Sequence, residues 1–353
     1  PFSTKHLVDV LPATVERIAV LDRTKEPGSI GDPLYLDVVA ALAQEGRNIK
    51  VIGGRYGLAS RDTQPKHIKS VYDFMASEKA HTDFTVGIND DVTFKSIEVD
   101  DNYHIKGDYT SCLFWGLGSD GTVSANKNSI KIIGDHTDMY AQGYFAYDSK
   151  KSGGLTVSHL RFGDKPIKST YYISKADFVA CHNPSYVTKY DIVDDLKDGG
   201  SFLLNCPWSG EELEEKLPAK MKRIIAEKNI NFYTIDGIKI GKEIGLGGRI
   251  NTILQSAFFT IANIIPKEDA VKYMKDAATK SYSKKGQNIV DMNHKAIERG
   301  TTDFVKVDVP ESWANAQGEL DKVVSTDGKA DVLEYVNTVL HPVNAYKGNQ
   351  LPV

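Results

Sequence analysis

Short apolar runs alternate with amphipathic stretches over the first part of the chain. The runs end in polar turns, as buried strands do, and the stretches between them repeat apolar residues at helical spacing. Asp32 and Pro33 fit the N-cap and first position of one such helix, and Gly46 fits its C-terminal end. We predict strands at 17–22, 50–54 and 84–88, and helices at 34–45 and 65–79. This order is typical of a βαβαβ unit with a parallel sheet.

A second cycle of the same pattern follows a polar, acidic stretch at 89–106. The predicted strands are 111–115, 141–147, 156–160, 178–182, 201–206 and 231–234. The predicted helices are 123–133, 211–228, 252–264, 267–281 and, more weakly patterned, 330–340. Pro218 falls inside the second of these helices and is expected to divide it.

The two cycles predict two consecutive α/β domains with mainly parallel sheets. A length of 353 residues suits two or three domains. We place a first domain at 1–105, a second at 106–312, and a linker-like segment at 313–353. The chain begins at Pro1 rather than Met and ends in a Pro- and Gly-containing tail. We therefore expect it to be a piece of a longer protein.

The amino-acid composition argues against several classes of function. The net charge of −4 gives no basic surplus of the kind that nucleic-acid-binding proteins carry. No apolar run reaches the roughly 18 residues of a membrane helix, and no targeting segment is recognised. The three cysteines, Cys112, Cys181 and Cys206, are far apart in sequence. They are predicted to be buried, reduced thiols rather than ligands of zinc or of an iron–sulfur cluster.

The turn Gly116-Leu-Gly-Ser-Asp-Gly-Thr122 lies between a predicted strand and a predicted helix. Its Gly-x-Gly-x-x-Gly spacing matches a dinucleotide fingerprint, in which glycines let the backbone approach a phosphate at a helix N-terminus. Asp138 or Asp148 could supply the acidic residue that follows in that fingerprint, but neither is cleanly placed. A plain structural turn and a phosphate-binding turn both remain open.

Two further glycine-flanked loops carry cations and favour a polyanionic ligand. Lys150 and Lys151 lie in Asp148–Gly154, and Arg249 lies in Gly245–Asn251 ahead of a helix. Ser119-Asp-Gly121 resembles the start of a thiamine diphosphate motif. Ser119 replaces its first glycine, however, and the expected Asn is missing from 144–148, so that cofactor is rejected for this segment.

Histidines near strand ends are weaker candidates. His159 and Arg161 alternate on one face of a predicted strand, and His182 follows the end of another, where ligands often bind in open α/β sheets. We interpret each of these residues either as a ligand contact or as a residue whose polar atoms bond within the protein. The second interpretation is favoured. The residues show no pattern of a nucleophilic catalytic site.

Long motifs give the chain a resemblance to a known family. Leu21–Gly28 followed by Gly31–Tyr35 resembles the transketolase C-terminal-like domain of pyruvate:ferredoxin (flavodoxin) oxidoreductases. Phe114–Val123, Tyr147–Gly154 and Gly245–Asn251 resemble the gamma domain of that family. Further matching motifs are Lys131–Gly134, Gln142–Tyr144, Ser158–Gly163, Ala180–Pro184 and, in the tail, Pro342–Ala345 with 351–353.

The resemblance implies an oxidoreductase that converts pyruvate and coenzyme A into acetyl-CoA, carbon dioxide and electrons. Thiamine diphosphate, magnesium and [4Fe-4S] clusters would lie in domains outside this chain. Ferredoxin, flavodoxin or a fused flavin reductase would take the electrons. The resemblance also implies a homodimer in the cytoplasm, or in an organelle in some eukaryotic relatives. It assigns contacts with coenzyme A to Gly118, Ser119, Gly121, Thr122, Val123, Asn126, Lys127, Lys150, Lys151, Arg249 and Asn251.

Three hypotheses of different kinds follow. The chain could be the coenzyme A-docking part of a 2-oxoacid oxidoreductase, without a complete catalytic centre of its own. It could instead be a scaffold that orders other domains and a dimer, without binding a ligand. A third reading is an ordinary NAD(P)-binding domain, which titration with NADPH would separate from the first.

Overall fold

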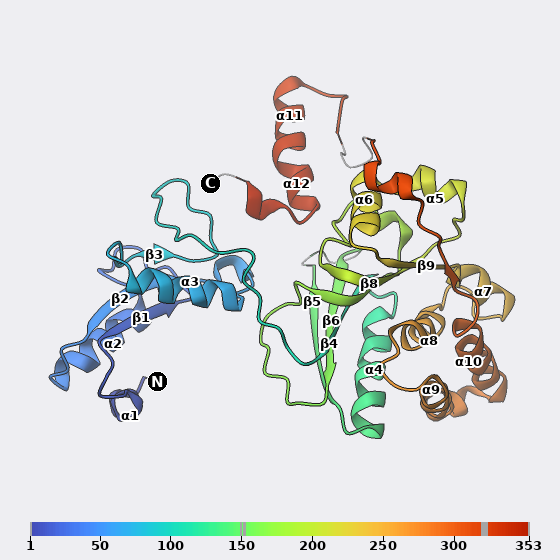
Figure 1. Ribbon diagram of the computed structural model, residues 1–353, viewed down its shortest axis with the longest axis horizontal. Coiled ribbons are helices and arrows are strands. Elements are labelled where there is room, and N and C mark those ends of the chain that lie inside the picture. The colour runs from blue at the N-terminus through green and yellow to red at the C-terminus, as the bar shows by residue number, and fades with distance from the viewer. Residues whose placement is uncertain (1, 149, 151–152, 319–323, 352–353) are drawn as a thin grey trace. The chain divides into compact units, whose positions relative to one another are not determined.

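A computed structural model describes residues 2–148, 150, 153–318 and 324–351. The described chain forms two compact units, each with its own sheet (Figure 1). The first unit runs up to Gly107 and also takes the segment from Glu334 onward, and the second unit is Asp108–Leu333. The described residues 313–318 and 324–333 group with the second unit. The predicted domain boundaries stay predictions.

The first unit contains a parallel three-stranded sheet in the order β1 (Arg17–Asp22), β2 (Lys50–Arg55) and β3 (Phe84–Thr85). Helices α1 (Thr4–Val10), α2 (Pro33–Gln44) and α3 (Pro65–Ala76) accompany it. Val38 and Leu42 of α2 pack with Val20, while Val71 of α3 packs with Phe84. The predicted order of strands and helices is confirmed, but the third strand is shorter than the predicted 84–88.

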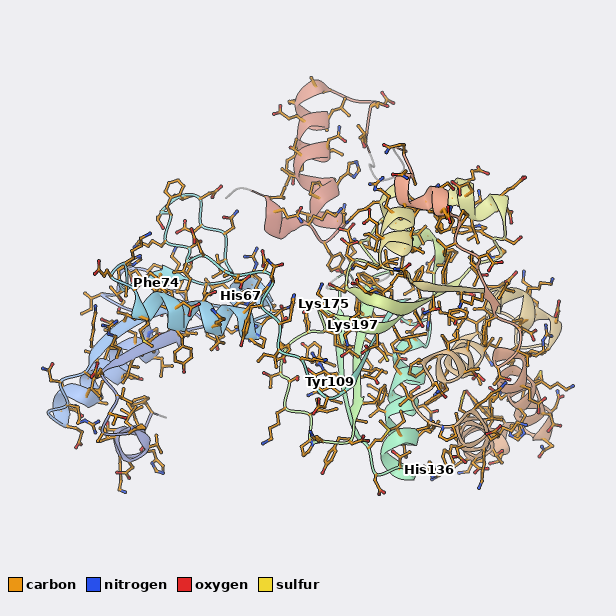
Figure 2. All side chains as sticks on the ribbon, in the orientation of Figure 1. His67, Phe74, Tyr109, His136, Lys175 and Lys197 are labelled. Carbon is orange, nitrogen blue, oxygen red and sulfur yellow. The ribbon has the colours of Figure 1, made fainter. Side chains whose placement is uncertain are left out.

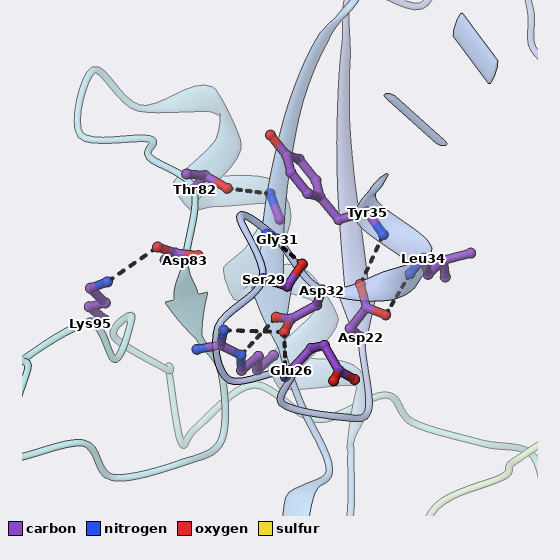
Figure 3. Close-up of polar contacts among 12 residues, drawn as sticks. Asp22, Glu26, Ser29, Gly31, Asp32, Leu34, Tyr35, Thr82, Asp83 and Lys95 are labelled. Atoms are coloured by element: carbon purple, nitrogen blue, oxygen red, sulfur yellow. Dashed lines mark hydrogen bonds and ion pairs between the residues drawn. The ribbon is translucent and has the colours of Figure 1, made fainter. Parts of the chain in front are cut away.

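The backbone N–H groups at the start of α2 are not capped by the side chain of Asp32, the predicted N-cap residue. Asp32 is the N-cap residue, yet its side chain makes no capping hydrogen bond to the helix. It pairs with Arg55, whose Nε lies 2.7 Å from a carboxylate oxygen. The backbone N–H groups of Leu34 and Tyr35 donate instead to Asp22 at the end of β1, at 2.9 and 3.0 Å (Figure 3). A carboxylate from the neighbouring strand therefore caps this helix.

The second unit is built on a seven-stranded sheet in the order β10-β9-β8-β7-β4-β6-β5. Its strands are β4 (Thr110–Leu117), β5 (Tyr140–Tyr147), β6 (Leu155–Gly163), β7 (Ala176–Cys181), β8 (Leu196–Asn205), β9 (Asn231–Ile235) and β10 (Val305–Lys306). Strands β4, β7, β8 and β9 are parallel, and β5, β6 and β10 join antiparallel at the two edges. The predicted α/β class is confirmed, with antiparallel additions at both edges.

Helices cover both faces of this sheet and give three layers. One face packs against α4 (Thr122–His136), α7 (Gly237–Glu243), α8 (Asn251–Ala262), α9 (Lys267–Tyr282) and α10 (Gln287–Gly300). The other face packs against α5 (Glu211–Lys216) and α6 (Ala219–Glu227), which Pro218 separates as predicted. The sequence pattern missed α1, α7 and α10. The predicted 330–340 helix is present as α11 (Ala330–Tyr335), a π-helical turn Val336–Leu340 and α12 (His341–Asn344).

The three cysteines are buried free thiols, as predicted. Burial raises the pKa of Cys181 and of Cys206 to about 12, so both stay protonated at neutral pH. In the described part of the chain, helices that combine the length and the apolar character needed to cross a membrane are absent.

Candidate phosphate-binding site

The Gly-rich turn joins the end of β4 to the start of α4. Gly121 is the N-cap of α4 and has φ +89°, and Ser119 has φ +73°. A side chain on Gly116 would collide with the hydroxyl of Thr122, so the first glycine is required for packing of strand against helix. The turn thus has the tight geometry that the spacing predicts.

The carboxylate of Asp120 lies inside this turn and holds its shape. It accepts the N–H of Leu117 at 2.9 Å and the N–H of Thr122 at 2.7 Å. One of the backbone donors that a helix N-terminus leaves open is therefore used by the chain itself. The sequence pattern missed this contact, although an Asp two residues before a helix is a known turn-forming signal.

Thr122 anchors the base of the turn to the sheet. Its hydroxyl lies 2.7 Å from Nδ1 of His182, and both residues are buried. Asn205 donates to the carbonyl of His182. Burial lowers the pKa of His182 to about 4, which keeps the imidazole neutral. His182 therefore matches the interpretation of an internally satisfied histidine.

The second glycine-flanked loop lies directly against the turn. The N–H of Gly118 donates to the carbonyl of Gly154 at 2.7 Å, which fastens the start of the turn to the end of the Asp148–Gly154 loop. Within that loop, Lys150 is half exposed and its Nζ lies 3.8 Å from Asp148. The predicted contact residue Lys151 lies outside the described residues.

The third loop meets the other end of the turn. Asn251 is the first residue of α8, and its side-chain amide lies where a Cβ on Gly121 would be. Arg249, two residues earlier, is exposed. Gln255 of the same helix donates to Asn128 of α4 at 3.0 Å, so α4 and α8 run in the same direction with their N-termini side by side. Two positive helix ends therefore meet at one place.

A cavity of about 540 Å³ opens beside these two helix starts. Its described lining contains the cations Arg249 and Lys285 and no Asp or Glu. The lining residues are Gly121, Ser124, Ala125, Asn128, Leu246, Arg249, Asn251, Thr252, Gln255, Met274, Ala277, Ala278, Ser281, Tyr282, Lys285, Ile289 and Asn293. The contributions of α9 and α10 were not predicted, because their residues lie far away in sequence and carry no phosphate-binding pattern.

Some predicted site residues lie on a different face of α4. Thr122 and Asn126 are buried, and with Ser129 they follow the helical spacing of the face that packs on the sheet. Lys127 lies with its Nζ 5.4 Å from the ring centre of Phe145. None of these side chains is among the described cavity lining; Ser124, Ala125 and Asn128 take that place. Their predicted contacts with coenzyme A stay predictions.

His159 and Arg161 are held by the protein itself. Ile173 donates its N–H to Nδ1 of His159 at 3.1 Å, and the imidazole stacks on Tyr172 with centroids 4.6 Å apart. Burial, with Arg161 nearby, lowers the pKa of His159 to about 3. Arg161 donates to Gln142 and to the carbonyl of Tyr171. This arrangement supports the packing interpretation for both residues.

Sequence comparison identifies the protein family. Residues 111–302, which contain the turn and the cavity, match the model of the family described as pyruvate ferredoxin/flavodoxin oxidoreductase. The chain belongs to the pyruvate ferredoxin/flavodoxin oxidoreductase family. The resemblance seen in the sequence motifs is thereby confirmed.

Relatives of this oxidoreductase family match over the whole chain. Identity is 56% over 355 residues with pyruvate:ferredoxin oxidoreductase of Moorella thermoacetica, covering 100% of this chain and 30% of that protein. It is 43% over 360 residues with the mitochondrial pyruvate dehydrogenase [NADP(+)] of Euglena gracilis, covering 100% of this chain and 20% of that protein. The chain thus spans less than a third of these relatives' length.

A solved structure of similar fold covers only part of the chain. It is a pyruvate oxidoreductase subunit from Thermotoga maritima, with 19% identity and a TM-score of 0.46. It covers 56% of this chain and 98% of that subunit.

Proposed function

We propose that this chain is the coenzyme A-docking part of a pyruvate:ferredoxin or pyruvate:flavodoxin oxidoreductase. One observation carries the proposal: three glycine-flanked loops converge on the adjoining N-termini of α4 and α8, beside a cavity whose described lining has two cations and no carboxylate. Coenzyme A carries a pyrophosphate and a separate 3′-phosphate. Helix N-termini and cations are the groups that bind such anions.

The residues present fit this ligand in a definite way. Backbone N–H groups at the start of α4 and the guanidinium of Arg249 would bind the pyrophosphate. The amides of Asn251 and Asn293 can donate to phosphate or amide oxygens, and Met274 and Ile289 offer apolar surface to the rest of the ligand. When bound, coenzyme A supplies the thiol that accepts an acyl group. This chain's residues bind and orient it and keep its phosphates at the helix ends.

The remaining steps of pyruvate oxidation would need other groups. Within the described residues, no cluster of three or more His, Cys, Asp or Glu side chains could hold a metal ion. The family resemblance supports proposing thiamine diphosphate, magnesium and [4Fe-4S] clusters for other parts of a full-length enzyme. Ferredoxin or flavodoxin would accept the electrons. A fused NADP-dependent portion is the alternative, since an NADP(+)-dependent relative matches the whole chain. A homodimer and a cytoplasmic or organellar location stay predictions.

Calorimetric titration of the chain with coenzyme A and with NADPH tests the proposal. We expect coenzyme A to bind and NADPH to bind at least tenfold more weakly. Arg249→Ala should weaken coenzyme A binding about tenfold, because a charge-assisted contact to phosphate is lost. Lys242→Ala is the matched control, since Lys242 is an exposed cation on α7 outside the cavity lining. Equal binding of NADPH would favour a dinucleotide domain, and no binding of either ligand would favour a scaffold.

A further inference from the structure

The orientation of α9 brings a second cation to the helix-start end of the cavity. His136, labelled in Figure 2, lies at the C-terminal end of α4. Its imidazole stacks on the ring of Tyr273 in α9, with centroids 4.0 Å apart. Later residues of α9 line the same cavity as the first turns of α4. The two helices therefore run in opposite directions. Tyr282 lies about 13 Å further along α9 than Tyr273, towards the start of α4.

Lys285 follows Tyr282 in a 3₁₀ turn, Ser283–Lys285, that connects α9 to α10. Its Nζ lies 5.4 Å from the centre of the Tyr282 ring, and both side chains line the cavity. Lys284, the adjacent lysine, is also exposed but is outside the described lining. Of two neighbouring lysines in one turn, only Lys285 is placed at the cavity.

The two lining cations come from different segments. Arg249 precedes α8 beside the Gly-rich turn, and Lys285 extends from the α9–α10 connection. Two cations, with no carboxylate in the described lining, suit a ligand with two separate phosphoryl groups.

We propose that Lys285 binds the 3′-phosphate of coenzyme A and so distinguishes coenzyme A from its 3′-dephospho form. This inference rests on the proposed function, because it names the contact made by one part of that ligand. A phosphate monoester carries close to two negative charges at neutral pH. An ammonium group binds it as a point charge from a flexible stem. Arg249 and the helix starts remain for the pyrophosphate, which both forms of the ligand carry.

The experiment compares coenzyme A and 3′-dephospho-coenzyme A by calorimetry on the full chain. The wild type should bind coenzyme A about tenfold more tightly. Lys285→Ala should remove most of this preference while leaving the affinity for the dephospho form within about twofold. Lys285→Arg should restore the preference in part, and Lys284→Ala should keep it. Circular dichroism of each variant checks that folding is unchanged.

The outcomes separate the two proposals. If both ligands bind the wild type equally, or if Lys285→Ala weakens both to the same extent, the assignment of Lys285 is overturned and coenzyme A docking stands. A loss of preference in Lys284→Ala equal to that in Lys285→Ala would also overturn the assignment. If neither ligand binds the wild type, coenzyme A docking is overturned and the Lys285 inference with it.

Discussion

Two cavities in the second unit have nearly equal volumes. They differ in the charged lining residues that are available to bind a ligand. The cavity beside the starts of α4 and α8, called the phosphate-side cavity below, measures about 540 Å³. The other, lined by the ends of β8 and β9, measures about 530 Å³. The second cavity lies where ligands commonly bind in open α/β sheets. Its described lining, however, contains Asp236, Glu243, Asp303 and Asp308 beside three cations, Lys239, Arg299 and Lys306.

Three of the charged side chains in the described lining of the second cavity, Arg299, Glu243 and Asp303, pair with one another. Arg299 lies 3.0 Å from Glu243 and also pairs with Asp303. Asp236 caps α7 by accepting the N–H of Lys239 at 2.9 Å. The phosphate-side cavity, by contrast, lies at two helix N-termini, and its described lining contains two cations and no carboxylate. Volume and position at the strand ends therefore say less about a ligand than the donors and charges that the protein leaves unpaired.

The largest effect should come from Gly121→Ala. Its φ of +89° is strained for a residue with a side chain, and the added Cβ would collide with the amide of Asn251. We expect the free energy of unfolding to fall by about 2–3 kcal/mol and coenzyme A binding to be lost. Urea unfolding and calorimetry measure the two effects.

Gly134→Ala is the matched control on the same helix. Nothing lies within 4 Å of a Cβ built at Gly134, which is exposed in the last turn of α4. That variant should be more stable by about 0.5–1 kcal/mol and bind as the wild type does. If Gly121→Ala kept normal binding, the close contact between the turn and α8 would not matter for the ligand.

The next effect depends on pH and concerns the base of the turn. The pKa of buried His182 is about 4, below the 6.5 of an exposed histidine, so the unfolded chain binds a proton before the folded chain does. Stability due to this residue is therefore complete above pH 6.5 and is lost as the pH falls towards 4, by up to about 3 kcal/mol. Urea unfolding at pH 7, 6 and 5 measures the slope.

His182→Gln should be less stable at pH 7 but show a shallower decline with acid. His159, whose pKa is about 3, also lowers the free energy of unfolding as the pH falls, and the variant retains this contribution. An unchanged slope in His182→Gln would mean that the pKa of His182 is the same in the folded and the unfolded chain, which would contradict the depressed value.

An added carboxylate should affect the two cavities differently. Ser281→Asp places a negative charge in the phosphate-side cavity, and Ser209→Asp places one in the other cavity; both serines are exposed and line their cavities. Ser281→Asp should weaken coenzyme A binding about tenfold through repulsion of its phosphates. Ser209→Asp should leave the affinity unchanged. Similar losses in both variants would show that the effect is one of overall charge.

The sequence predicted local elements well and long-range contacts poorly. Gly116–Thr122 was recognisable because its spacing reflects a strand, a turn and a helix that are contiguous in the chain. The family motifs pointed to Arg249 and Asn251, which the structure brings to the same turn. Lys285 carried no such signal, since its place at the cavity depends on α9 lying antiparallel to α4 and on the unpredicted α10. Which face of α4 is buried decides that Asn128 lines the cavity while Asn126 packs inside.

The smallest effect should come from Arg299→Ala, the arginine of the second cavity. Arg299 pairs with Glu243 and Asp303, but its side chain is 37% exposed, so solvent screens both contacts. We expect the free energy of unfolding to fall by less than about 1 kcal/mol, with coenzyme A affinity unchanged. Arg249→Ala should show the reverse, with affinity reduced about tenfold and stability almost unchanged. Urea unfolding and calorimetry on the two variants provide both measurements. Loss of coenzyme A affinity in Arg299→Ala, with stability nearly unchanged, would place the ligand at the strand ends instead, because the substitution would then act on binding without disturbing the fold.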